Sequence, residues 1–247
     1  MRHKPVIQFL PGSDCAVLMI HGILGSPSHF DFLMPLIPEN WSVYNILLDG
    51  HGGSAGDFGR TSMKKWKAQV ADQLSLLRQR HKKILIVTHS MGGLFAIQEA
   101  VKDPEGIAGI FALAVALTPR VSLRGALSSV KAAFGWVSEK DPVTTAMRND
   151  SSVELTRNVF AYIPWIDKFV ALLWEARRTC AMVEKLNVPC HAVQSARDEM
   201  VSLRSCKVLK KNPGIGVTVM EHSGHFGYEE AEKEKVLACF SHLLGEL

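Results

Sequence analysis

The sequence has few cysteines and none of the spacings that mark a metal site. Its 247 residues include five cysteines, an odd and widely spaced set without a C-x-x-C pair. We therefore expect reduced thiols, several of them in the core, rather than disulfides or a zinc site. Ten histidines are present, but neither H-x-H nor H-E-x-x-H occurs. The sequence thus predicts no metal.

The sequence also lacks an apolar run long enough to cross a membrane. The first apolar stretch covers only residues 6–10 before Pro11-Gly12, which is too short for a signal peptide or a membrane span. We expect a cytoplasmic protein without stable membrane insertion. The net charge of +4 comes from 28 basic and 24 acidic residues that are spread along the chain. Lysines and arginines within residues 64–83 lie on or beside an amphipathic helix, which indicates a solvated face and no nucleic-acid partner.

What the sequence does contain is an alternation of strands and helices. The apolar run at residues 84–87 shows no polar alternation, as expected of a strand buried on both faces of a parallel sheet. Apolar residues three or four apart predict an amphipathic helix over residues 61–80. Further strands are predicted at residues 6–10, 16–20, 41–48, 107–113, 188–194 and 216–220, and further helices from residue 91 and at 203–210 and 228–244. This order predicts an α/β fold with a doubly wound sheet.

One long segment interrupts the alternation. Between residues 120 and 185 no strand is evident, but helical segments rich in Ala, Leu and Trp are. This is too long for one crossover and too structured for a loop. We predict a core domain of residues 1–118 and 186–247 and a helical cap at 119–185. Aromatic residues of the cap either line a shared apolar pocket or form ordinary core: Trp136, Phe160, Trp165, Phe169 and Trp174.

A serine stands at the junction of the strand at 84–87 and the helix that follows it. The segment Thr88-His89-Ser90-Met91-Gly92 fits the nucleophile-elbow pattern G-x-S-x-G, in which a sharp turn exposes the serine above the sheet edge. Thr88 replaces the usual first glycine, at a place where strand and helix pack closely. The alternative is a helix-capping serine in an ordinary loop.

Other polar motifs follow the ends of the remaining strands. They are His21-Gly22, Gly50-His51-Gly52-Gly53-Ser54, Asp198 and Ser223-Gly224-His225. The carboxyl ends of parallel strands share one sheet edge, where ligands bind. Serine hydrolysis needs a nucleophile, a base, an acid that orients the base, and oxyanion donors. Ser90, His225 and Asp198 supply the first three. The glycine-rich loops match neither G-x-x-x-x-G-K-[ST] nor G-x-G-x-x-G, so no nucleotide site is predicted.

Together these motifs resemble the α/β-hydrolase fold serine hydrolases, and most nearly small bacterial carboxylesterases and monoacylglycerol lipases with a short helical cap. The resemblance implies a mostly parallel sheet flanked by helices, with the cap inserted. It implies Ser90 as nucleophile, His225 as general base and then acid, and Asp198 as the orienting carboxylate. The backbone N–H groups of Ile23 and Met91 would form the oxyanion hole. No cofactor is implied.

Each catalytic assignment has a rival. His222 competes with His225 for the role of the base. Glu199 competes with Asp198 for the role of the acid, as do Asp103 and Asp141 if the acid comes from the preceding strand. The remaining histidines of these motifs have more modest expected roles: His21 shapes the oxyanion loop, His51 belongs to a turn, and His89 is structural or lines the pocket.

The resemblance implies a serine carboxylester hydrolase that cleaves short to medium acyl esters or monoacylglycerols through an acyl-enzyme. Its expected partner is a small-molecule acyl ester. Other hydrolases of the same fold are the first alternative, namely thioesterases, aminopeptidase-like enzymes and carbon–carbon bond hydrolases. A noncatalytic small-molecule binder is the second. The sequence leaves the oligomeric state open.

Overall fold

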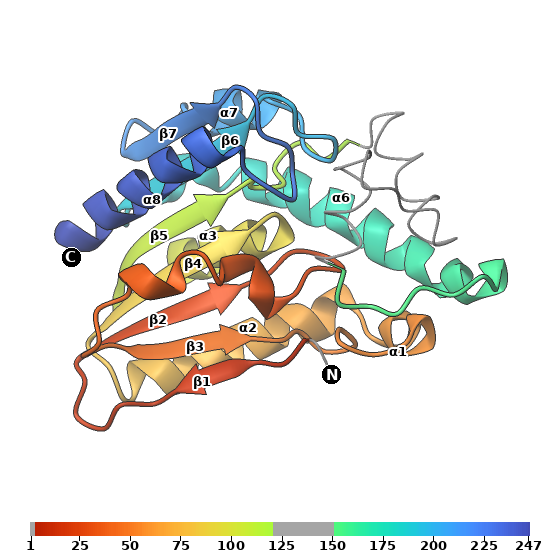
Figure 1. Cartoon of the computed structure of the whole chain (residues 1–247), viewed down its shortest axis with the longest axis horizontal. Helices are drawn as coiled ribbons and strands as arrows, with labels where there is room; N and C mark the ends of the chain where they lie inside the picture. Colours follow the sequence, from red (N-terminus) through yellow and green to blue (C-terminus); the bar gives the residue numbers. More distant parts are fainter. Residues whose placement is uncertain (1–2, 121–150) are drawn as a thin grey trace.

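The computed structural model describes residues 3–120 and 151–247, which form a seven-stranded sheet between two layers of helices (Figure 1). The strand order is β1-β3-β2-β4-β5-β6-β7. Only β1 runs antiparallel to its neighbour, and all other pairs are parallel. The strands are β1 (Val6–Gln8), β2 (Cys15–Ile20), β3 (Ser42–Ile46), β4 (Lys83–His89), β5 (Ile107–Leu113), β6 (Cys190–Ser195) and β7 (Ile215–Met220).

Helices cover both faces of the sheet, which explains why its central strands are apolar throughout. On β4, Ile84 and Ile86 face one core together with the helices α2 (Met63–Arg78), α3 (Met91–Lys102) and α6 (Ile166–Cys180). Leu85 and Val87 face the other core, with η1 (Pro27–Phe30) and α8 (Glu230–Gly245). Residues 84–88 of β4 are fully buried in this way. The predicted fold class, a mostly parallel sheet flanked by helices, is confirmed.

Most predicted elements lie within a few residues of the observed ones, and the differences have local causes. After Ser26 the sequence predicts a helix that starts at Ser28 or Asp31 and ends by Pro35 or Pro38. The structure instead has two 3-10 turns, η1 and η2 (Met34–Leu36), because prolines interrupt the segment. A short helix that we did not predict, α1 (Ala55–Arg60), follows the glycine loop. It begins at Ser54, whose hydroxyl accepts the Asp57 N–H while the Asp57 carboxylate accepts the Ser54 N–H. This capping box starts a helix that two internal glycines disfavour.

Part of the predicted cap packs against the helices of the core. Glu175 of α6 accepts hydrogen bonds from Lys67 of α2 and Gln98 of α3, each at 2.9 Å. The segment before α6 contains the turn η3 (Val159–Trp165), whereas residues 121–150 lie outside the described part of the chain. The domain limits at residues 118 and 186 stay a prediction. The remaining elements are η4 (Val183–Lys185) and α7 (Arg204–Leu209), and every helix within 3–120 and 151–247 is too short or too polar to cross a bilayer.

Candidate active site

Ser90 occupies a strained turn between β4 and α3. Its backbone has φ 53° and ψ −115°, and a positive φ of this kind costs a residue other than glycine about 1–3 kcal/mol. The turn is held from both sides: the Ser90 N–H donates to Leu113 O at 2.9 Å, and the Ser90 carbonyl accepts the N–H of Gly93 at 3.1 Å. Its hydroxyl makes no capping bond to α3. The alternative of a helix-capping serine is therefore wrong, and the backbone is that of a nucleophile elbow.

Two glycines allow α3 to approach the sheet at this turn. A Cβ atom on Gly92 would lie 2.2 Å from the carbonyl oxygen of Ile20, and one on Gly93 would lie 3.0 Å from a Val115 methyl group. Gly93 also explains how Thr88 is tolerated, since its missing Cβ would lie 3.3 Å from Thr88 Oγ1. That buried hydroxyl has no hydrogen-bond partner among the described residues. Threonine in place of the usual glycine therefore leaves one buried polar atom unpaired but causes no steric clash.

Asp198 and His225 form a buried pair. The His225 Nδ1–H donates to Asp198 Oδ2 at 2.7 Å. Asp198 Oδ1 accepts the N–H groups of Met200 and Val201, each at 2.7 Å, which fixes the plane of the carboxylate. The two side chains are 2% and 4% exposed. Because Nδ1 is bonded to the carboxylate, Nε2 is the nitrogen left to take up a proton.

This pair lies next to the elbow, as the order of strand ends predicts. The ring of His89, which precedes Ser90, is 4.7 Å from the His225 ring between centroids, and its Nε2–H donates to the His225 carbonyl at 3.1 Å. Within the part of the chain that the structure describes, the Ser90 hydroxyl itself makes no hydrogen bond to His225. Catalytic hydrogen bonds commonly tighten only when substrate is bound. The residue before Ser90 is therefore in contact with His225, and His225 is already bonded to Asp198.

The rivals of these residues lie elsewhere or make different contacts. His222 is exposed and contacts Arg197 at 3.1 Å. Asp103 forms an ion pair with Arg78 at 3.2 Å beyond the far end of α3. Asp141 lies outside the described residues. Glu199 does reach His225, but its Oε2 accepts the backbone N–H at 3.1 Å rather than a ring nitrogen.

Both expected oxyanion donors are available. The N–H groups of Ile23 and Met91 have no acceptor within residues 3–120 and 151–247. Met91 opens α3, so its N–H lies at the positive end of the helix dipole. The loop that carries Ile23 lies directly against the elbow, because a Cβ on Gly22 would come within 2.8 Å of Ser90 Cβ. These two donors could therefore bind one negative oxygen beside Ser90.

Two buried histidines hold the Ile23 loop. His21 donates from Nδ1 to Gly22 O at 2.8 Å and accepts the Leu48 N–H at Nε2. His51 accepts the Leu24 N–H at Nε2, at 3.1 Å, and its Nδ1 lies 3.2 Å from Leu48 O. Leu24 needs such support, since its φ is 59°. The bonding pattern assigns both rings as neutral, with the proton on Nδ1.

The electrostatics agree with neutral rings. Burial lowers the pKa of His51 to about 4, although the carbonyl groups at Asp49 and Leu48 oppose the shift. Burial, with a further contribution from the charge of His51, also holds the pKa of His21 well below its ordinary value. The pKa of His89 is likewise well below its ordinary value because of burial and then the neighbouring His29 and His225. These histidines therefore act as hydrogen-bonding groups rather than as charges near neutral pH.

Sequence reasoning did not anticipate the supports of the His225 loop. Glu232 of α8 accepts the N–H groups of Glu221 and His222 and the hydroxyl of Ser223. Burial would raise the pKa of Glu232, but these hydrogen bonds outweigh it and lower the pKa. His29 was also missed; its ring packs on that of His89 at a tilt of 31°, with centroids 3.8 Å apart. No motif in the sequence indicated these contacts.

The described aromatic residues of the predicted cap differ in their surroundings. Trp165 is core: it packs on Phe58 with ring centroids 4.6 Å apart, and its Nε1–H donates to Ala55 O. Phe160 and Trp174 are 73% and 65% exposed, while Trp136 lies outside the described residues. The segment predicted as the cap reaches the Ile23 loop at Ser152, whose N–H donates to Leu24 O at 2.9 Å.

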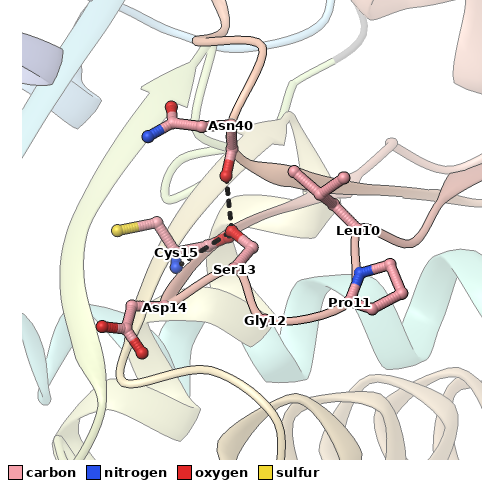
Figure 2. A pocket seen from close by; sticks show the side chains of 7 residues that line it. All are labelled: Leu10, Pro11, Gly12, Ser13, Asp14, Cys15 and Asn40. Carbon is pink, nitrogen blue, oxygen red and sulfur yellow. Dashed lines mark hydrogen bonds between the residues drawn. The ribbon is translucent and has the colours of Figure 1, made fainter.

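A pocket of about 410 Å³ lies far from these residues (Figure 2). It is lined by the turn between β1 and β2 and by Asn40, at the amino ends of the parallel strands, whereas Ser90 lies at a carboxyl end. Its central hydroxyl, on Ser13, already donates to Asn40 O at 2.6 Å. The catalytic residues proposed here do not line it. Among the described residues, no cluster of three or more potential ligands could hold a metal ion.

The chain was compared with known protein families, curated proteins and solved structures. The model of the alpha/beta hydrolase family matches residues 17–238. The chain belongs to the α/β hydrolase family. Over 95 residues the hydrolase is 33% identical to a thermostable monoacylglycerol lipase of Bacillus sp. (strain H-257), a match that covers 38% of each chain. The match thus spans well under half the length of that relative.

Solved structures share the fold of the hydrolase over its whole length. One, from work on the metagenome-derived lipolytic enzymes LipS and LipT, has a TM-score of 0.72 at 19% identity and covers 98% of this chain and 97% of that one. The monoacylglycerol lipase of Paleococcus ferrophilus has a TM-score of 0.69 at 17% identity, with both chains fully covered. At these identities the likeness concerns the fold.

Proposed function

We propose that this α/β hydrolase is a serine carboxylester hydrolase that cleaves short to medium acyl esters or monoacylglycerols through an acyl-enzyme. The observation that carries the proposal is the strained Ser90 turn beside the buried Asp198–His225 pair. A non-glycine residue held at positive φ is maintained only by surrounding structure and is typical of functional sites. The lipases among the related proteins support an ester substrate.

In the proposed reaction, His225 Nε2 takes the proton of the Ser90 hydroxyl as the oxygen attacks the acyl carbonyl carbon. Asp198 stabilises the imidazolium that forms. The N–H groups of Ile23 and Met91 bind the oxyanion, and His225 then protonates the leaving alcohol. Water, deprotonated by His225, releases the acid and restores Ser90.

Most substitutions leave a backbone N–H in place, but proline has none, so Ile23→Pro deletes one donor. Loss of one oxyanion donor costs about 3 kcal/mol, which corresponds to roughly a hundredfold or more in rate. Apart from the ester and water, each step uses only groups of the chain.

The proposal is tested with p-nitrophenyl butyrate and a monoacylglycerol series of increasing chain length. Ser90→Ala is expected to abolish turnover, and Ser151→Ala, which removes the hydroxyl of a loop serine bonded to Val153 O, is the matched control. Unchanged turnover in Ser90→Ala would contradict the proposal. Parallel assays with acyl-thioesters, aminoacyl amides and carbon–carbon substrates test the alternatives, because pocket shape rather than triad chemistry sets this choice.

A further inference from the structure

The main chain of His225 is held at both of its polar groups by buried side chains. Its N–H donates to Glu199 Oε2 at 3.1 Å, and its carbonyl accepts the Nε2–H of His89, also at 3.1 Å. Glu199 is 6% exposed and His89 is 3% exposed. One of these side chains follows Asp198 in sequence and the other precedes Ser90. Each therefore ties the proposed base to the loop that carries one of its two partners.

The Asp198 hydrogen bond alone would not place the ring of His225. It sets the rotation of the imidazole and the location of its proton, but the Cα atom moves with the loop between β7 and α8. That loop has no regular hydrogen-bonded structure over residues 221–229. Two main-chain bonds fix the Cα atom itself, and from it the distance between Nε2 and Ser90 Oγ.

Gly224 allows the carboxylate to come close. A Cβ atom at this position would lie 3.0 Å and 3.1 Å from the two oxygens of Glu199, which is tighter than ordinary contact. The carboxylate therefore lies flat against the main chain immediately before His225. Glu232 supports the same loop further upstream, at residues 221–223, and makes no hydrogen bond to His225 in the described structure.

We propose that Glu199 and His89 are positioning residues, which clamp the main chain of His225 and keep its Nε2 in line with Ser90. The inference rests on the proposed function, because it assigns His225 as the base. Neither side chain is required to touch substrate. A displacement of about 1 Å at a reacting group lowers rates by up to roughly a hundredfold, so loss of the clamp should lower kcat and leave KM largely unchanged.

The test compares a variant that deletes each contact with one that preserves it. Glu199→Ala removes the acceptor, whereas the amide oxygen in Glu199→Gln can still accept the N–H. His89→Leu removes the donor, whereas the amide NH₂ in His89→Gln reaches about as far as Nε2. Glu221→Gln removes an exposed carboxylate from the same loop and is the matched control. Kinetics with p-nitrophenyl butyrate, labelling by a fluorophosphonate, and hydrogen exchange of residues 221–229 are measured on the full chain.

We expect Glu199→Ala and His89→Leu to lower kcat about 10- to 100-fold with KM within about twofold. Glu199→Gln and His89→Gln should recover most of that loss. The alanine and leucine variants should exchange the amides of residues 221–229 faster than the wild type, whereas Glu221→Gln should match the wild type in every readout. If Glu199→Ala does not fold, the His89 pair carries the same comparison.

The possible failures differ in what they show. An active wild type whose Glu199→Ala and His89→Leu variants keep full kcat overturns the clamp alone. Equal losses in the deleting and preserving variants, or losses confined to KM, also overturn it. A wild type that neither hydrolyses the ester nor is labelled at Ser90 overturns the proposed function, and with it the positioning role.

Discussion

Replacing His51 by glutamine should change how the stability of the hydrolase depends on pH. His51 is buried and neutral, and its Nε2 accepts the Leu24 N–H in the loop that carries Ile23. The amide oxygen of glutamine can accept the same bond and does not titrate. The substitution therefore removes the proton equilibrium while leaving the loop its acceptor.

The sign and size follow from the pKa of His51, which burial lowers from 6.5 to about 4. Above pH 6.5 the ring is neutral in the folded and unfolded states alike. As the pH falls below 6.5, the unfolded chain binds a proton that the folded chain does not bind until about pH 4. Stability is therefore lost as the pH falls, by at most about 1.4 kcal/mol per unit. Integrated from pH 7 to pH 5, this amounts to about 2 kcal/mol.

The assay is urea unfolding of the wild type and His51→Gln at pH 7, 6 and 5, followed by two probes whose transitions must coincide. Burial is the larger cause of the low pKa of His21 and acts in both proteins, so the titration of the other buried histidines largely cancels in the difference. We expect the free energy of unfolding of the wild type, relative to His51→Gln, to fall by about 2 kcal/mol from pH 7 to pH 5. A difference that is the same at all three pH values would refute the assignment of His51 as a buried neutral ring.

Two further predictions concern the packing of the elbow. Thr88→Val replaces a buried hydroxyl that has no partner in the described structure with a methyl group of similar shape, and thermal unfolding should show a gain of about 1 kcal/mol; a loss would mean that the hydroxyl is bonded after all. Gly92→Ala places a Cβ 2.2 Å from Ile20 O, so α3 must shift and both the melting temperature and turnover should fall sharply. Gly227→Ala, where a Cβ meets nothing within 4 Å, should behave like the wild type in both measurements, and equal effects of the two substitutions would contradict the packing argument.

The sheet could be predicted because its central strands are continuous apolar runs in the sequence. The run at 84–87 is apolar on both faces, and both faces are covered by helices. The helix from Met91 and the strand at 107–113 begin where the sequence indicates. By contrast, α1 was missed because glycine content argued for a loop, and a capping box between Ser54 and Asp57 outweighed it. Local hydrogen bonds of this kind decide short elements that propensity alone leaves open.

Within the candidate site, the sequence could predict only the residues that follow the ends of strands. Asp198 and His225 were selected because both follow strands of one sheet edge, and the structure joins them at 2.7 Å. The contacts that orient these residues could not be predicted from the sequence, because they depend on the conformations of individual side chains. Glu199 was weighed as a rival acid, yet it bonds to the main chain of His225. The contact between the rings of His29 and His89 depends in the same way on tertiary packing.

The central claim is that Ser90 is the nucleophile, activated by His225 and Asp198. The most direct measurement is to label the full chain with a fluorophosphonate, digest it, and locate the adduct by mass spectrometry. The account predicts one adduct, on Ser90, and its loss both in Ser90→Ala and after prior incubation with a slowly hydrolysed ester. A chain that stays unlabelled, or an adduct on any other residue with Ser90 unmodified, would contradict it.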